Sequence, residues 1–101
     1  AEISPAFAGT LDSVANTIKE YCGVTGTVIG HTDSTGTPDG NRKLSLERAR
    51  SVSSYLMARG VDGARLQQFR RGQDEPIAPN NTDQGRAQNR RVEIFVRPPA
   101  S

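Results

Sequence analysis

The sequence predicts an α/β fold, and specifically an α+β two-layer sandwich in which a small mixed β-sheet packs against two main helices. Residues 5–21 and 46–59 place apolar side chains at helical spacing. Residues 27–32 and 92–96 are rich in β-branched residues, and the second of these segments alternates as a half-buried strand does. A weaker strand at 65–71 completes the order helix, strand, helix, strand, strand.

Length and composition indicate one small domain spanning residues 1–101 with a single core. No apolar run approaches the roughly 18 residues of a membrane span. The formal charge is +2, and arginines concentrate in residues 86–97, which predicts a basic edge. Nucleic acid is the usual partner of such an edge, but the chain has no Trp and only 5% aromatic residues for base stacking. We therefore do not expect it to bind nucleic acid.

The first helix begins at Ser4-Pro5, since proline favours the first helical position, and ends near Tyr21. The single cysteine, Cys22, cannot form an internal disulfide, and we expect it to be buried as a small apolar residue. The core-facing side chains of this helix recur at i, i+4, i+7 and i+11: Phe7, Leu11, Val14 and Ile18.

The segment 33–43 is predicted to be a loop, because it contains Gly36, Pro38 and Gly40. Ser45 then serves as the N-cap of the second helix, which places Arg48 in its first turn. The core stripe of this helix comprises Ala49, Val52 and Leu56. Beyond the strand at 65–71, a surface loop covers residues 72–83, one helical turn is expected near 83–88, and the last strand buries Val92, Ile94 and Val96.

An arginine in a first helical turn is unfavourably placed, because the positive end of the helix dipole favours an acid there by about 0.3 to 1 kcal/mol. Arg48 should therefore have a compensating partner, either a carboxylate such as Asp33 or an anionic ligand. A pocket with one carboxylate and one guanidinium is complementary to a zwitterion. The alternative is that Asp33 and Arg48 pair with each other and simply fasten the loop.

Three enzymatic or metal-binding interpretations fit the residues less well. Asp33-Ser34-Thr35 has Thr35 where aspartic proteases have glycine, and the two helical segments contradict their all-β fold. His31 and Asp33 could ligate a metal only with further ligands, and the chain contains no other histidine. Residues 33–39 lack the acidic positions of a calcium loop. We expect neither catalysis nor a cofactor.

Two blocks of residues at fixed spacing resemble a known family. The first comprises Gly30-His31-Thr32-Asp33-Ser34-Thr35-Gly36, Asn41 and Leu44-Ser45-x-x-Arg48-Ala49. The second comprises Pro76-Ile77-Ala78 and Asn80-x-Thr82-x-x-Gly85-Arg86-Ala87-x-Asn89-Arg90-Arg91-Val92-Glu93-Ile94. Together they cover residues 28–96 and resemble the OmpA-like C-terminal domain, which also occurs in peptidoglycan-associated lipoproteins and in the stator protein of the flagellar motor.

This resemblance implies non-covalent binding of bacterial peptidoglycan in the periplasm, through the meso-diaminopimelate of the stem peptide. Such a domain anchors an outer-membrane or envelope protein to the cell wall and meets the membrane only through the rest of its parent protein. By the same resemblance, Asp33 and Arg48 would hold the diaminopimelate, Thr35 and Asn41 would line the pocket, and Arg90 would close it. The alternative is an OmpA-like interaction or assembly domain that has lost wall binding.

The chain departs from the family pattern in two places. Arg70 stands where the family usually has the first glycine before the proline loop, so we expect that loop to change shape. The first helix begins almost at Ala1, without the strand that commonly precedes it in the family. The sheet is therefore expected to lack one strand, and an uncovered edge could pair with a second copy as a homodimer.

Overall fold

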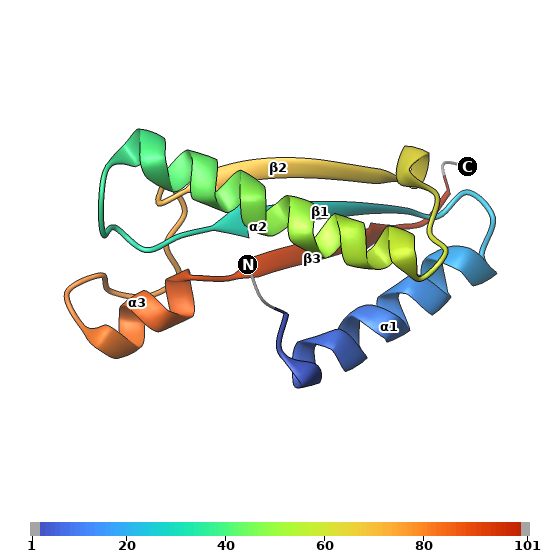
Figure 1. Ribbon diagram of the computed structural model, residues 1–101, viewed down its shortest axis with the longest axis horizontal. Helices are drawn as coiled ribbons and strands as arrows, with labels where there is room; N and C mark the ends of the chain where they lie inside the picture. The colour runs from blue at the N-terminus through green and yellow to red at the C-terminus, as the bar shows by residue number, and fades with distance from the viewer. Residues whose placement is uncertain (1–2, 100–101) are drawn as a thin grey trace.

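The computed structural model describes residues 3–99. It confirms the predicted class, since helices and strands form a two-layer α/β domain (Figure 1). The elements in chain order are α1 (Pro5–Glu20), β1 (Thr25–His31), α2 (Pro38–Ala58), the 3₁₀ turn η1 (Gly63–Arg65), β2 (Leu66–Gly72), α3 (Asp83–Asn89) and β3 (Val92–Arg97).

The sheet is mixed, as predicted, with the strand order β2-β1-β3 in residues 3–99. The central strand β1 runs parallel to β2 and antiparallel to β3. Figure 1 shows α1 and α2 on the same side of the sheet, with α2 along its length. The loop after β1 and the segment between α3 and β3 consequently meet at one end of the domain.

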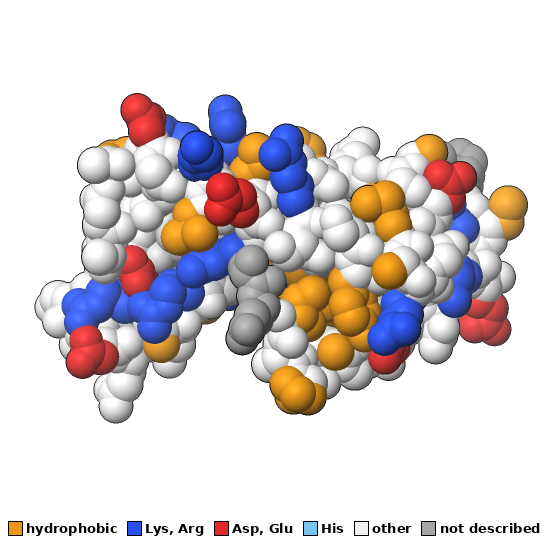
Figure 2. Space-filling model, in the orientation of Figure 1, with side chains coloured by type: hydrophobic (Ala, Val, Ile, Leu, Met, Phe, Trp, Pro, Cys, Tyr) orange, Lys and Arg blue, Asp and Glu red, His pale blue; other side chains and the backbone are white. Residues whose placement is uncertain are grey.

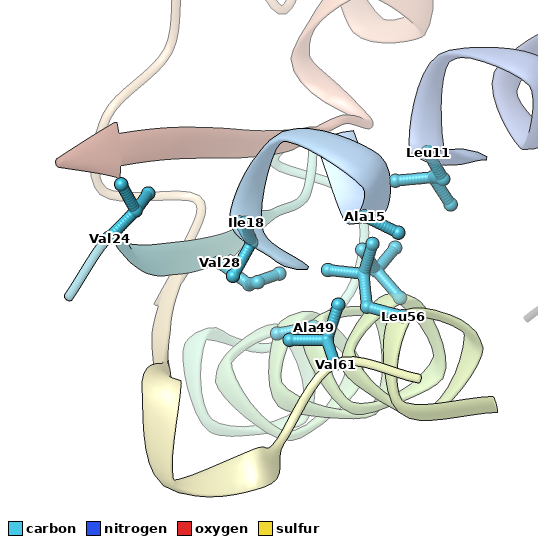
Figure 3. Packing of buried hydrophobic residues seen from close by; sticks show 9 residues of the cluster. Leu11, Ala15, Ile18, Val24, Val28, Ala49, Leu56 and Val61 are labelled. Atoms are coloured by element: carbon cyan, nitrogen blue, oxygen red, sulfur yellow. The ribbon is translucent and has the colours of Figure 1, made fainter. Parts of the chain in front are cut away.

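The core lies between the two helices and the sheet, where side chains from α1, α2 and β1 point toward one another (Figure 3). The predicted stripes are confirmed. Leu11 and Ile18 are fully buried, while Phe7 and Val14 pack partly buried against them. The α2 stripe is buried in full, and the whole cluster comprises Leu11, Ala15, Ile18, Val24, Val28, Ala49, Val52, Leu56 and Val61.

The start of α2 differs from the prediction. The helix begins at Pro38, and Thr37 is its N-cap, with a side chain that accepts a hydrogen bond from the Gly40 amide at 3.0 Å. Residues 38–43 are thus helical rather than loop. Pro38 does not break the helix, because at the first helical position its missing N–H costs nothing and its fixed φ suits the helix.

Ser45 is consequently not a cap but a buried contact between α2 and the sheet. Its hydroxyl donates to the carbonyl oxygen of Arg42 at 2.8 Å and accepts from the amide of Gly72 at 3.0 Å. On β1, a Cβ at Gly30 would lie 1.9 Å from the carbonyl oxygen of Ser45, so only glycine fits. This close approach fixes α2 against the C-terminal end of β1, which is followed by the loop that contains Asp33.

The strand β2 continues through Arg70, which pairs with Gly30, and a register shift follows between Gly30 and His31. The left-handed conformation falls on Gly72, with φ 55°. Arg70 therefore does not require the expected change in loop shape, because Gly72, two residues later, adopts the conformation that needs a glycine.

Two burial predictions near the other end of the sheet were wrong. Val92 and Ile94 pack against the core as expected, but Val96 is 40% exposed because it faces an open cleft beyond the end of α1. Cys22 is exposed, since it lies in the turn that leads from α1 to β1.

Among the described helices, none is both long enough and apolar enough to cross a bilayer.

Candidate functional site

Asp33 lies two residues beyond the end of β1 and is almost completely buried. Its Oδ1 accepts a hydrogen bond from the Thr35 amide at 2.8 Å. Its Oδ2 forms an ion pair with Nη1 of Arg90 at 2.6 Å. Both carboxylate oxygens are therefore engaged, and the side chain is held in one orientation at the mouth of the loop.

These contacts decide the ionisation of Asp33. Burial by itself raises the pKa of the carboxyl, but the hydrogen bond from the Thr35 amide and the contact with Arg90 outweigh it, so that the pKa lies below its usual value. Asp33 is thus a carboxylate over the whole physiological range and can accept a hydrogen bond from an ammonium group.

Arg48 lies on α2, ten residues after Pro38. The prediction that it lies in the first helical turn was therefore wrong. Its side chain is half-buried, and Nη1 donates to the carbonyl oxygen of His31 at 2.9 Å. Within residues 3–99 it forms no ion pair with a carboxylate. Desolvation and then the nearby charge of Arg90 lower its pKa, and only the more distant attraction of Asp33 opposes them.

The predicted reason for expecting a partner of Arg48, its place in a first helical turn, was therefore wrong. Arg48 lies far from the positive end of the helix. Its charged form is disfavoured instead by burial and by the nearby charge of Arg90. The alternative in which Asp33 and Arg48 pair with each other is also wrong. Asp33 pairs with Arg90 instead, while the tip of Arg48 is held by the backbone at the end of β1.

Asn41 and Thr35 complete the group of predicted site residues. Asn41 is buried in the first turn of α2, and its Nδ2 donates to the carbonyl oxygen of Asp33 at 3.2 Å and to Oε1 of Gln73 at 2.8 Å. Thr35 is exposed in the loop, with its amide on the Asp33 carboxylate. The structure thus gathers the five predicted residues around the end of β1: Asp33, Thr35, Asn41, Arg48 and Arg90.

A second polar cluster beside the site was missed. The buried His31 ring makes a 2.7 Å contact through Nε2 with Oε1 of Glu93, and Nε of Arg91 lies 3.2 Å from Oε2 of the same carboxylate. Burial raises the pKa of Glu93, but the bonds from His31 and Arg91 outweigh it, so that the pKa is lowered. Strand alternation alone could not reveal this contact, because it depends on the pairing of Glu93 with Ile29, which puts Glu93 on the same sheet face as His31.

Asn89 was also missed as a structural residue. It is fully buried, and its Oδ1 accepts from the amides of Ile77 at 2.8 Å and Ala78 at 3.1 Å. Its Nδ2 donates back to the carbonyl oxygen of Ala78 at 2.9 Å. These bonds fasten the loop before α3 and so fix the position from which the next residue, Arg90, reaches Asp33.

The surface around the site is basic. Figure 2 shows Lys and Arg side chains gathered over α3 and the start of β3, with few acidic side chains among them. In the described part of the chain, no three His, Cys, Asp or Glu side chains come together as metal ligands. The charged groups that the site presents are one carboxylate, on Asp33, and two guanidinium groups, on Arg48 and Arg90.

A helix-covered mixed sheet with this arrangement at the end of its central strand is an OmpA-like domain, and the chain belongs to the OmpA family, which it matches over residues 1–90. It is 50% identical over 98 residues to the probable lipoprotein YiaD of Escherichia coli, covering 97% of this chain and 45% of that protein. It is 44% identical over 96 residues to the peptidoglycan-binding protein ArfA of Mycobacterium tuberculosis, covering 95% of this chain and 29% of that protein. The chain thus spans less than half the length of these two relatives.

Among solved structures, the chain is similar to the peptidoglycan-associated lipoprotein of Burkholderia pseudomallei. The TM-score is 0.91 at 26% sequence identity, and the match covers 95% of this chain and 81% of that one. The family predicted from the two motif blocks is therefore confirmed.

Proposed function

We propose that this domain binds bacterial peptidoglycan without catalysis, and that Asp33 and Arg48 recognise the free end of meso-diaminopimelate in the stem peptide. The observation that carries the proposal is the half-buried guanidinium of Arg48, which forms no ion pair with a carboxylate of residues 3–99 and lies near the ionised Asp33. A buried cation without a counter-ion is costly, and an anionic ligand removes that cost.

The free end of diaminopimelate has an ammonium and a carboxylate on the same carbon. Asp33 accepts hydrogen bonds from the ammonium, and Arg48 binds the carboxylate through its planar fork. Thr35 and Asn41 hold Asp33 and line the pocket, and Arg90 closes it from the start of β3. Lysine-type walls offer the amine without the adjacent carboxylate, so they should bind poorly.

The relatives support this assignment through what their names say. ArfA is named a peptidoglycan-binding protein, and the similar Burkholderia structure is that of a peptidoglycan-associated lipoprotein. The domain then acts in the periplasm as the wall-binding part of a longer outer-membrane or envelope protein, and anchors that protein non-covalently.

Co-sedimentation with purified cell walls tests the proposal. We expect the domain to sediment with diaminopimelate-type walls and to remain largely in solution with lysine-type walls. Soluble DNA added as a competitor should not release it, because a basic surface alone is not the binding site. Equal retention on both wall types, or release by DNA, would contradict the assignment.

A second candidate function, protein interaction without wall binding, is favoured by two exposed aromatic side chains. Phe69 and Phe95 are 39% and 50% exposed, and their pairing with Ile29 and Thr27 places them on the sheet face opposite the helices. A domain of this second kind would sediment with neither wall, so the same assay separates the two functions.

A further inference from the structure

The charges of the site do not balance. In residues 3–99, Arg90 forms an ion pair with one carboxylate, that of Asp33. Arg48 forms none with the carboxylates of these residues and donates instead to the carbonyl oxygen of His31. The neighbouring Arg91 has its own partner in Glu93 and adds no free charge. Counted over residues 3–99, one carboxylate and two guanidinium groups leave the site with an excess of one positive charge.

A zwitterionic ligand end does not correct this imbalance, because it adds one ammonium and one carboxylate. It also creates a competition. Each oxygen of Asp33 already accepts one hydrogen bond, so an incoming ammonium either shares Oδ2 with Arg90 or displaces it. The Arg90 side chain is 44% exposed whereas that of Asp33 is 9% exposed, so Arg90 is the partner that is free to move.

The position of the two arginines gives the displaced group somewhere to bind. Arg48 and Arg90 line the same surface hollow, of about 370 Å³, between the start of α1, α2 and the start of β3. A ligand that contacts Arg48 from this hollow therefore lies beside Arg90. A guanidinium released from Asp33 next to a bound ligand retains an uncompensated charge unless the ligand supplies a second anion.

We infer that the ligand binds with two carboxylates, one on Arg48 and one on Arg90, and that Arg90 exchanges Asp33 for the second carboxylate when the ligand ammonium binds. This inference rests on the proposed function and specifies its ligand as a stem-peptide fragment with a second free carboxylate next to the recognised end. Two groups of the stem peptide have this chemistry: the α-carboxylate of the neighbouring D-glutamyl residue and the carboxylate at the other end of the diaminopimelate.

Calorimetry with three synthetic peptides tests the exchange. The parent is L-Ala-γ-D-Glu-meso-diaminopimelate with all carboxylates free, and the other two carry a carboxamide in place of either the D-glutamyl α-carboxylate or the second diaminopimelate carboxylate. We expect one carboxamide to weaken binding by at least about tenfold, since it removes a charge-assisted bond to Arg90. The weakened peptide identifies the source of the second carboxylate.

The protein variants show whether Arg90 causes the difference. In Arg90→Gln the penalty for that carboxamide should shrink to less than about twofold, and in Arg90→Lys part of it should remain, because the charge is kept without the fork. Arg97→Gln is the matched control, since Arg97 is an exposed arginine at the far end of β3, and it should retain the full penalty.

Equal affinities for the three peptides, or a penalty unchanged in Arg90→Gln, would overturn the exchange while leaving the proposed wall binding intact. Failure of all three peptides and of the cell walls to bind the wild-type domain would overturn the proposed function and this inference with it.

Discussion

Asp33 and Arg90 form an ion pair in which Oδ2 and Nη1 lie 2.6 Å apart, although 57 residues separate them in the chain. The pair joins the loop after β1 to the residue between α3 and β3. Arg48, on α2, lies beside Arg90 and pairs with no carboxylate in the described part of the chain. Removing Arg48 should therefore affect ligand binding much more than folding.

We expect Arg48→Ala to remain folded and to lose about 2 to 5 kcal/mol of affinity for a diaminopimelate-containing muropeptide, as when one partner of a desolvated charge pair is removed. The fold tolerates the change because Arg48 is half-buried beside the like charge of Arg90. Calorimetry gives the affinity, and thermal unfolding followed by circular dichroism gives the stability.

The control for this variant is Arg50→Ala, because Arg50 is an exposed arginine on the same helix. It should bind the muropeptide with nearly unchanged affinity. A folded Arg48→Ala protein that binds as tightly as Arg50→Ala would remove Arg48 from the ligand site.

Helical periodicity was sufficient to predict which faces of α1 and α2 line the core. The stripes of α1 and α2 were correct because side-chain spacing reports directly which helix face is buried. The predicted start of α2 was wrong, because Pro38 and Gly40 are typical of loops. In the structure the cap at Thr37 determines where the helix starts. Local propensity could not decide between Thr37 and Ser45, because both are good capping residues.

Asp33 and Arg48 were predicted from their places at the two ends of the loop, and the resemblance to the family added Thr35, Asn41 and Arg90. Neither line of reasoning predicted how these residues pair. Partner choice depends on long-range geometry: Asp33 meets Arg90 because β3 lies antiparallel beside β1, and the His31 carbonyl holds Arg48 because α2 crosses that strand. The contact between His31 and Glu93 likewise joins residues 62 positions apart. Such contacts follow from strand order, which the sequence of this chain alone leaves open.

Two glycine substitutions should have opposite effects, because β1 and α2 lie in close contact at Gly30 whereas the surroundings of Gly9 are open. Gly30→Ala should strongly destabilise the domain, because the new Cβ would lie 1.9 Å from the backbone carbonyl oxygen of Ser45, which cannot move without shifting the helix. Gly9→Ala is the matched control in α1, where no other atom lies within 4 Å of the new Cβ. It should stabilise the domain by up to about 1 kcal/mol. Urea unfolding of both variants measures the difference, and a Gly30→Ala protein of wild-type stability would contradict this packing.

Ser45 should contribute to stability as a contact between α2 and β2. Ser45→Ala removes the acceptor of the Gly72 amide and leaves that buried N–H without a partner, which should cost about 1 to 3 kcal/mol in the free energy of unfolding. Ser54→Ala, at an exposed position of the same helix, should change the stability by less than about 0.5 kcal/mol. Similar unfolding free energies for the two variants would show that the Gly72 amide finds another partner.

The lowered pKa of Asp33 predicts how its contribution to stability depends on pH. A carboxyl group whose pKa is lower in the folded protein stabilises it fully above the unfolded pKa of about 3.9, and this contribution is lost as the pH falls through the folded value. Asp33→Asn should therefore be less stable than wild type at pH 7, by on the order of 1 kcal/mol, because Arg90 is partly exposed and the pair is screened by water. The difference should stay constant from pH 7 to about pH 5 and shrink below about pH 4.

Urea unfolding of wild type and Asp33→Asn at a series of pH values measures this difference. Glu93, whose pKa is also lowered, is present in both proteins, so its contribution cancels in the comparison. Asp74→Asn provides the control, because Asp74 is an exposed acid in the loop after β2, and its difference from wild type should remain small at every pH. A difference between wild type and Asp33→Asn that stays constant down to pH 2 would mean that the ionised carboxylate of Asp33 does not stabilise the fold through Thr35 and Arg90.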